Sequence, residues 1–188
     1  MVQQEPQDSN KKKIVKESFS SETISIIGDL LAGSFLSLLI LHFKSFGSLI
    51  LIIPALLSLR GNLSGPFIAR TSRDLIIGEF EKRSWLENIL ATIFLSILTS
   101  ILIGIISIFL NLLLVKNILL TIGHFILIPV LSILFTLSIS IPCSTILNLL
   151  AFRKGIDPNN LVNTLMTAID DFFTVICFYL SLILLGVP

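Results

Sequence analysis

Residues 54–66 read PALLSLRGNLSGP, and this stretch decides how the chain folds. A largely apolar stretch leads up to it from residue 48, and the segment continues to residue 77, yet Arg60 stands in the middle. A charge in hydrocarbon is costly, so one that is kept there faces a cavity, a partner or an ion path. A second charged cluster, Asp170-Asp171, lies within the last apolar stretch. Ion movement across a membrane is therefore the leading hypothesis.

The composition is that of a membrane protein. The chain has 188 residues, of which 54% are hydrophobic and 13% charged, and its mean hydropathy is +0.97. A soluble domain of this size cannot hide so much apolar surface in one core, because its surface is large relative to its volume. The bilayer must be the solvent for most of it. The net charge of +1 argues against nucleic acid as a partner, since nucleic acid requires a concentrated basic face.

The apolar stretches predict an all-α, polytopic membrane protein with five transmembrane helices. Residues 1–22 are polar, and we expect a cytoplasmic N-terminal tail that is disordered or forms a short interfacial helix. Residues 23–188 are expected to form the five-helix cation-transport domain. Asp157 is suited to N-cap the last helix, with Pro158 as its first residue. The spans are expected at residues 23–43, 48–77, 88–115, 118–152 and 159–185, with a charged loop at 78–87 and turns at 44–47, 116–117 and 153–158.

The second span is expected to be broken. Its uncharged part, residues 48–59, is too short to cross an apolar core of about 30 Å, so the helix must continue past Arg60. Gly61, Gly65 and Pro66 disfavour helix, and such residues are tolerated at membrane depth where protein or water satisfies the freed backbone. An unwound turn here would direct carbonyl groups, with Asn62 and Ser64, toward an ion path. A packing kink stabilised by Asn62 is the alternative.

The distribution of basic residues predicts the orientation. Ten of them fall on one side of the predicted spans, and only Lys44 and Lys116 fall on the other. The positive-inside rule places the ten in the cytoplasm, so the N-terminus is inside and, with five spans, the C-terminus is outside. We therefore expect a multi-pass protein of the cell membrane, surrounded by lipid. The ten are Lys11, Lys12, Lys13, Lys16, Arg70, Arg73, Lys82, Arg83, Arg153 and Lys154.

The last span carries a polar stripe. Asn163, Thr167 and Asp171 are four residues apart, so each lies about 40° round the helix from the one before, and Asp170 and Thr174 share the sector. Carboxylate, amide and hydroxyl oxygens in a line suit a hard, hydrated cation, and Mg²⁺ keeps several of its waters. The stripe therefore predicts a metal path. The alternative is a polar clamp between helices, with an acid that is protonated or paired with arginine.

Three further charges have open roles. Arg60 is the counter-ion of Asp29, the counter-ion of an acid in the last span, or a side chain that extends to a lipid headgroup. Asp29 is either a partner of Arg60 or part of the ion path. Glu79 either attracts cations at the cytoplasmic end of the second span or is a solvated charge.

Enzyme chemistry is not expected. No HExxH, GxSxG, P-loop or GxGxxG pattern occurs in a fitting context. Cys143 and Cys177 both lie in apolar runs without CxxC spacing, and we interpret them as small buried hydrophobic residues.

Two separated stretches resemble the MgtE magnesium transporters. Pro54-Ala55-Leu56-Leu57-Ser58-Leu59-Arg60-Gly61-Asn62, followed by Arg73 and Gly78-Glu79, resembles their second transmembrane helix, and more closely that of their solute-carrier relatives. Asp157-Pro158-Asn159-Asn160, followed by Asp171, resembles their fifth helix. The resemblance covers the membrane domain alone. The chain departs from the bacterial pattern at Ser64, where that pattern has glycine, and at Pro66, where it has glutamine.

The resemblance implies a dimer in which helices two and five of both copies line a central pore. Asp171 would be the principal magnesium-binding acid, with Asn163, Thr167, Gly61, Asn62 and Ser64 near the path. We expect transport of a divalent cation, Mg²⁺ first, with Mn²⁺, Co²⁺ or other divalent ions as alternatives. The partner is a second copy or a half-size paralogue. The competing hypotheses are a non-transporting membrane subunit or assembly factor, and an exchanger of cations against Na⁺ or H⁺.

Overall fold

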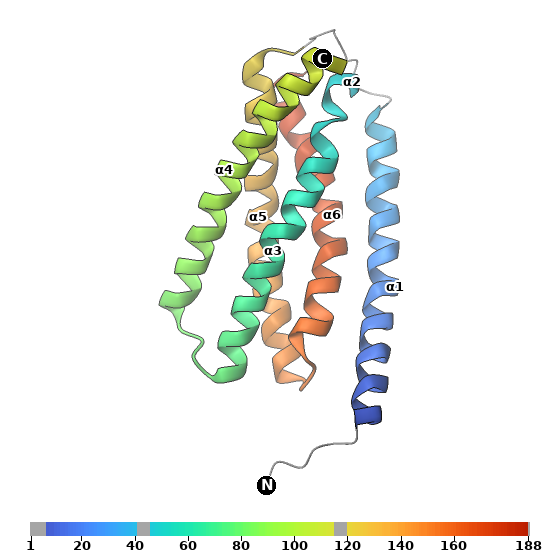
Figure 1. Cartoon of the computed structure of the whole chain (residues 1–188), viewed down its shortest axis with the longest axis vertical. Coiled ribbons are helices and arrows are strands. Elements are labelled where there is room, and N and C mark those ends of the chain that lie inside the picture. The colour runs from blue at the N-terminus through green and yellow to red at the C-terminus, as the bar shows by residue number, and fades with distance from the viewer. Residues whose placement is uncertain (1–6, 41–45, 115–119, 188) are drawn as a thin grey trace.

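A computed structural model describes residues 7–40, 46–114 and 120–187. Every regular element in these ranges is an α-helix, as the sequence predicted, and five of the six helices are long. Figure 1 shows the long helices running side by side in alternating directions. The elements are α1 (Gln7–Ile40), α2 (Phe46–Leu49), α3 (Ile52–Ile77), α4 (Lys82–Leu114), α5 (Ile122–Arg153) and α6 (Pro158–Leu184).

The helices form a bundle with α1 at its edge. Helices α3, α4 and α5 contact one another, and α6 packs against both α3 and α5, whereas α1 packs chiefly against α6. Figure 1 shows α1 standing at one side of the bundle, next to α6. The end of α3, the start of α4, the end of α5 and the start of α6 lie at the same end of the molecule. Helix α6 therefore packs between α1 on one side and α3 and α5 on the other.

Four helical segments are long and apolar enough to cross a membrane, judged by length and composition over the described residues. They correspond to the second to fifth predicted spans, and the first span, in α1, stays a prediction. The segments are Gly47–Ile77, Lys82–Leu114, Ile122–Arg153 and Leu161–Leu184.

The expected break of the second span is in a different place. Residues 61–66 are helical and lie within α3, whereas the chain turns at Ile50-Leu51, between α2 and α3. Pro54 explains the turn, because it has no N–H to donate to the carbonyl of residue 50, and in the first turn of α3 none is needed. Pro66 is accommodated inside α3, where it leaves the carbonyl of Asn62 without its usual helical donor.

Several element boundaries also differ from expectation. Helix α1 begins at Gln7 and continues into the predicted first span, so the structure has no break at residue 22. Helix α4 begins at Lys82, which shortens the charged loop. Helix α6 begins at Pro158, as predicted. The turn predicted at residues 116–117 and the first half of that at 44–47 lie outside the described residues.

Helix α3 ends at Ile77, as predicted, and has a defined C-terminal cap. Gly78 has φ +77°, the left-handed conformation that glycine adopts without steric cost. Its N–H donates to the Leu75 carbonyl at 3.3 Å, and the Glu79 N–H donates to the Asp74 carbonyl at 2.9 Å. This pair of bonds is the Schellman arrangement, which satisfies carbonyls that the helix end would leave free.

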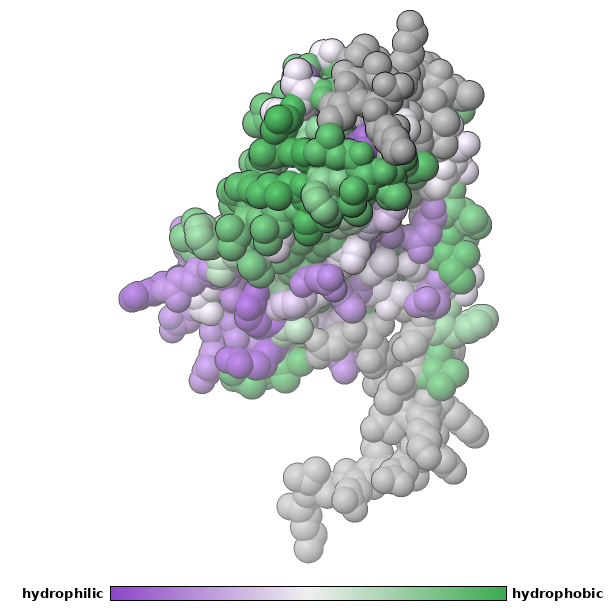
Figure 2. All heavy atoms as spheres, turned by 45° about the horizontal axis from the view of Figure 1, so that its top comes forward, coloured by the Kyte–Doolittle hydropathy of each residue, from purple (hydrophilic) through white to green (hydrophobic). Residues whose placement is uncertain are grey.

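Helix α4 has a polar interior face and an apolar exterior face, the reverse of a soluble helix. At Gly104 an added Cβ would lie 2.6 Å from the Phe125 carbonyl oxygen, so α4 and α5 approach very closely there. Small residues permit such packing between membrane helices. Figure 2 shows a broad hydrophobic surface that gives way to hydrophilic residues at the end where α4 begins. The buried residues of α4 are Thr92, Ser96, Ser100, Gly104, Ser107 and Asn111, and its exposed ones include Leu90, Phe94, Leu98, Leu102 and Phe109.

Candidate ion-binding site

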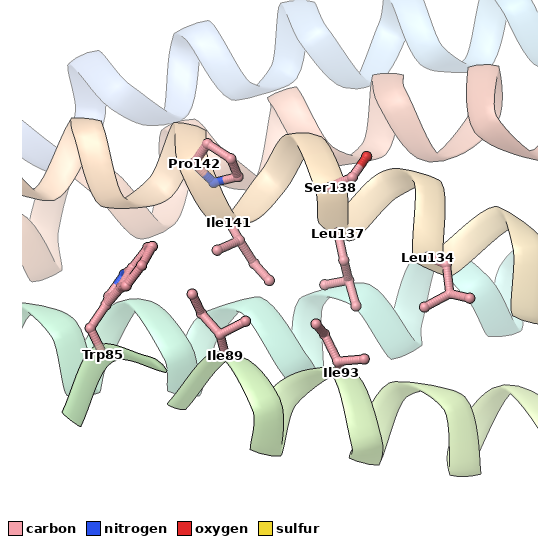
Figure 3. Close-up of a pocket in the computed structure, with 8 residues that line it drawn as sticks. All are labelled: Trp85, Ile89, Ile93, Leu134, Leu137, Ser138, Ile141 and Pro142. Atoms are coloured by element: carbon pink, nitrogen blue, oxygen red, sulfur yellow. The ribbon is translucent and has the colours of Figure 1, made fainter. Parts of the chain in front are cut away.

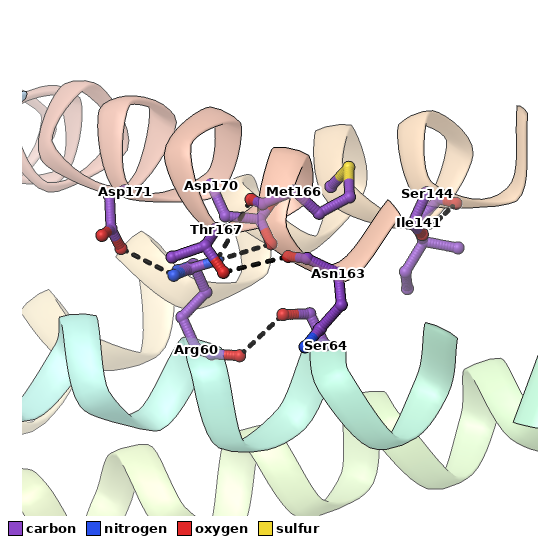
Figure 4. A network of polar contacts seen from close by, with 9 residues as sticks. All are labelled: Arg60, Ser64, Ile141, Ser144, Asn163, Met166, Thr167, Asp170 and Asp171. Carbon is purple, nitrogen blue, oxygen red and sulfur yellow. Dashed lines mark hydrogen bonds and ion pairs between the residues drawn. The ribbon is translucent and has the colours of Figure 1, made fainter. Parts of the chain in front are cut away.

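Arg60 of α3 pairs with both adjacent acids of α6. Its Nη1 lies 2.8 Å from Oδ2 of Asp170, and its Nη2 lies 2.7 Å from Oδ1 of Asp171. Figure 4 shows the guanidinium group between the two carboxylates. Consecutive side chains on a helix point in directions about 100° apart, and the planar fork of arginine can serve both. Of the three roles open to Arg60, the structure gives it that of counter-ion to the acids of the last span.

Asp170 lies in the interior of the protomer. Its side chain is 1% exposed, and the hydroxyl groups of Ser140 on α5 and Ser64 on α3 are within hydrogen-bonding reach of it. The Ser64 hydroxyl also donates to the Arg60 carbonyl at 3.0 Å. Asp170 thus ties three helices together, which corresponds to the clamp that the sequence left as an alternative.

Asp171 has a different environment. Its side chain is 21% exposed, and the Asp29 carboxyl group of α1 lies within hydrogen-bonding reach of it. Both acids line a cavity of about 180 Å³ between α1, α3 and α6, which has room for several waters at about 30 Å³ each. The structure therefore brings Asp29 to Asp171 rather than to Arg60. The other lining residues are Ala32, Gly33, Leu36, Leu57 and Val175.

The stripe on α6 is partly outward-facing. Asn163 is exposed and Thr167 is half-buried, and the Thr167 hydroxyl donates to the Asn163 carbonyl at 3.0 Å. A Cβ added at Gly65 of α3 would lie 3.6 Å from Asn163 Oδ1, so these two positions adjoin. Thr174 is buried instead, and its hydroxyl has no hydrogen-bond partner among the described residues. The structure thus separates Thr174 from the outward-facing part of the stripe.

The exposed side of α3 continues this outward-facing surface. Between residues 54 and 73 none of its exposed side chains is a large hydrophobic one. Such a surface is poorly suited to lipid, because polar groups in hydrocarbon are left without hydrogen-bond partners. Ser64 lies on the opposite, buried side, with Asp170. The exposed residues, here called the α3 polar face, are Pro54, Ser58, Gly61, Asn62, Pro66, Ala69, Arg70 and Arg73.

Glu79 lies far from these groups. It follows the C-terminal cap of α3 and is exposed. The helix from Arg60 to Ile77 is about 25 Å long at 1.5 Å per residue, so Glu79 cannot share a site with Asp171. It lies in the short loop between α3 and α4.

No group of three or more His, Cys, Asp or Glu side chains that could hold a metal ion occurs in the described ranges. The carboxylate beside Asp171 is that of Asp29. Thr167 and Asn163 supply further oxygens one and two turns earlier on α6. A weakly held, hydrated ion suits such a set better than a dehydrated one, and Mg²⁺ retains several waters in proteins.

A separate pocket between α4 and α5 is apolar. It has a volume of about 330 Å³ and includes Ser138 as its one hydroxyl-bearing residue. Figure 3 shows isoleucine and leucine side chains of the two helices lining it, with Trp85 at one end. Such walls suit a lipid chain and do not suit a hydrated ion. The lining residues are Trp85, Ile89, Ile93, Leu134, Leu137, Ser138, Ile141 and Pro142.

Helix α5 has a buried polar spine that was not predicted from the sequence. The Asn148 side chain accepts a hydrogen bond from the Ser72 hydroxyl at 2.9 Å and donates to the Ile68 carbonyl at 3.3 Å. These bonds fasten α5 to the C-terminal half of α3. The sequence signal for this spine is a serine, threonine or asparagine at every fourth residue, because that spacing places the side chains on one face of a helix. The buried spine is Ser132, Thr136, Ser140, Ser144 and Asn148.

The comparisons with known proteins gave one match. The family model MgtE, described as a divalent cation transporter, matches residues 53–181, which is more than half of the chain. No curated protein matches the chain. No solved structure matches it either.

Proposed function

The chain belongs to the MgtE family of divalent cation transporters, and on that premise we propose that it carries Mg²⁺ across the cell membrane. Mn²⁺, Co²⁺ and other divalent ions are the alternative cargoes. The observation that carries the proposal is that the two adjacent acids of α6 have different environments. Asp170 is sealed and paired with Arg60, whereas Asp171 reaches a cavity shared with Asp29.

The α3 polar face supports a dimer. In one copy this face is exposed, and in a bilayer it would meet hydrocarbon. A second copy, or a half-size paralogue, that packs with its own polar face opposite would enclose a wet path. Helices α3 and α6 of both copies would then line the pore, with Gly61, Asn62 and Gly65 on one wall and Asn163, Thr167 and Asp171 on the other.

Transport in this arrangement needs no ATP. A hydrated cation is attracted by Asp171 and Asp29, and it passes along polar side chains and the Asn62 carbonyl, which Pro66 leaves without its helical donor. The membrane potential supplies about 2.3 kcal/mol per charge per 100 mV and drives the ion inward. Exchange against Na⁺ or H⁺ is the alternative coupling.

The orientation follows from the basic residues. Arg70, Arg73, Lys82, Arg83, Arg153 and Lys154 belong to the ends of α3 and α5 and the start of α4, which lie together in Figure 1. The positive-inside rule favours the cytoplasm for this end. The N-terminus is then cytoplasmic and the C-terminus external, with α1 as the first span.

The second candidate is a non-transporting membrane subunit or assembly factor. The Arg60–Asp170 pair favours it, because a buried pair between α3 and α6 also serves to hold helices together. In that case Asp171 would have no role in ion movement. Enzymatic activity is not part of either proposal.

The test is a flux assay with purified protein in proteoliposomes under a membrane potential that is negative inside. We expect Mg²⁺ uptake by the natural protein and a loss of most of it in Asp171→Asn. Glu87→Gln makes the same carboxylate-to-amide change at an exposed position on α4 and serves as the matched control. Equal uptake by Asp171→Asn and the control, or no uptake by the natural protein, would refute transport through this site. Repeating the assay with Mn²⁺, Co²⁺ and Ca²⁺ gives the selectivity.

A further inference from the structure

We propose that Arg60 is a resident cation that competes with the transported ion for Asp171, and so keeps that ion weakly held. The inference rests on the proposed function. It assigns Arg60 a positioning role in ion binding, beyond that of a counter-ion in a helix clamp.

The two arms of the Arg60 fork are unequally accessible. The Nη1 arm is anchored in the interior, at 2.8 Å from Asp170 and 3.4 Å from the Met166 carbonyl oxygen. The Nη2 arm reaches Asp171, whose side chain is 21% exposed and borders the cavity. An ion that arrives through the cavity therefore meets Asp171 and not Asp170. It can replace the Nη2 contact while the anchor on Asp170 remains.

The guanidinium group is incompletely satisfied in this arrangement. The Arg60 side chain is 3% exposed, yet its Nε has no hydrogen-bond partner within the described residues. A buried donor without a partner is costly. Nε makes no bond within the described ranges that would hold the guanidinium in its present position. When the guanidinium leaves Asp171 it loses the Nη2 bond and the charge attraction to that acid, and the arriving cation takes over this attraction.

The charge balance fits a divalent cargo. With a cation bound and all three acids ionised, Asp29, Asp170 and Asp171 carry three negative charges against the one positive charge of Arg60. The remaining two negative charges match one Mg²⁺. Conduction requires an ion to be attracted strongly enough to enter and weakly enough to leave. Two carboxylates free of any competitor would hold the ion longer, and Arg60 lowers that affinity because it occupies an oxygen of Asp171.

A paired substitution isolates the competition. The double variant Arg60→Gln/Asp170→Asn removes one positive and one negative charge together, so the net charge of the cluster is unchanged. It also avoids an unpaired buried charge, which would destabilise the protein strongly. Asp171 and Asp29 keep their side chains but lose the competitor.

The measurements are the half-saturating Mg²⁺ concentration and the maximal uptake rate in proteoliposomes, together with Mg²⁺ binding by calorimetry on the intact protein. In the double variant we expect the half-saturating concentration to fall about tenfold, the factor that corresponds to about 1.4 kcal/mol. The maximal rate should fall as well, because a more tightly held ion leaves more slowly. An unchanged or raised half-saturating concentration overturns the inference.

Arg60→Lys provides an independent measurement on a variant that keeps the charge. An ammonium group is a point charge and cannot span two carboxylates as the planar fork does. If it stays with the sealed Asp170, the half-saturating concentration should lie between those of the natural protein and the double variant. If Arg60→Lys has the same half-saturating concentration as the natural protein, the inference is overturned. This measurement decides the matter even if the double variant does not fold. Failure of the proposed function looks different, because the natural protein would then show no uptake.

Discussion

Gly28 of α1 lies directly against Ala168 of α6: a Cβ added at residue 28 would fall 2.5 Å from the Ala168 Cβ. This approach lets α1, which packs chiefly on α6, bring the neighbouring Asp29 to Asp171. The family match covers residues 53–181 and does not include α1. Only the structure shows that α1 helps to form the cavity.

The first prediction concerns this contact. In Gly28→Val the branched side chain cannot fit against Ala168, and we expect a loss of about 1 to 3 kcal/mol in the free energy of unfolding, the usual cost of overpacking. Gly33→Ala on the same helix is the matched control, because an added Cβ there has no neighbour within 4 Å. Denaturant unfolding in detergent measures both. Equal stability of the two variants would mean that α1 does not rest on α6 in this way.

The second prediction concerns the buried ion pair. Arg60→Ala leaves Asp170 sealed without a cation, and breaking a buried pair on one side costs about 3 to 5 kcal/mol. The Arg60→Gln/Asp170→Asn variant should recover most of that loss, since no unpaired charge remains. Arg83→Ala removes an exposed pair with Glu87 and should change stability by at most about 1 kcal/mol. If Arg60→Ala were no more destabilising than Arg83→Ala, the pair would not be buried as described.

The third prediction concerns the α3 polar face. With Cys143 and Cys177 replaced by alanine, single cysteines at positions 58, 62 and 69 should be cross-linked into a dimer by a bifunctional thiol reagent, because the proposed dimer brings two copies together at this face. Cysteine at position 98 on α4, where Leu98 is exposed among other large hydrophobic residues, is the lipid-facing control. Gel mobility measures the dimer. Cross-linking at position 98 in preference to all three α3 positions would contradict the proposed interface.

The fourth prediction concerns the spine of α5. Asn148→Ala removes a buried side chain that bonds both the Ser72 hydroxyl and the Ile68 carbonyl. Leaving such buried groups without a partner costs about 1 to 3 kcal/mol each. Ser138→Ala, at an exposed position of the same helix, should have little effect. In a double-mutant cycle with Ser72→Ala, a coupling energy near zero would show that the Asn148–Ser72 bond does not hold α5 to α3.

Local patterns in the sequence predicted the elements well and their partners poorly. The start of α6 at Pro158 follows from Asp157-Pro158 alone, because proline is favoured at the first helical position. The predicted break at residues 61–66 was wrong because glycine and proline only disfavour a helix. In α3 the surrounding helices stabilise the helical form, and the chain turns at Ile50-Leu51 instead.

The outward-facing stripe was only partly predicted. Helical periodicity put Asp170, Asp171 and Thr174 on one sector, but a sector of about 100° is wide enough to include both buried and exposed positions. The rotation of α6 against α3 and α5 decides between them, and it buries Asp170 and Thr174 while leaving Asp171 partly exposed. In the same way Ser64 lies inside although Gly61 and Asn62 lie outside.

The sequence by itself determined the membrane class and four of the spans, because hydropathy and length must match the thickness of the bilayer whatever the packing. It also determined the family, through the pattern of residues 53–181. Only the tertiary structure decided that Arg60 pairs with acids 110 and 111 positions later, and that Asp29 joins Asp171. Such choices depend on how the side chains of α1, α3, α5 and α6 interlock. That geometry is a property of the packed helices together, and no single stretch of the chain contains it.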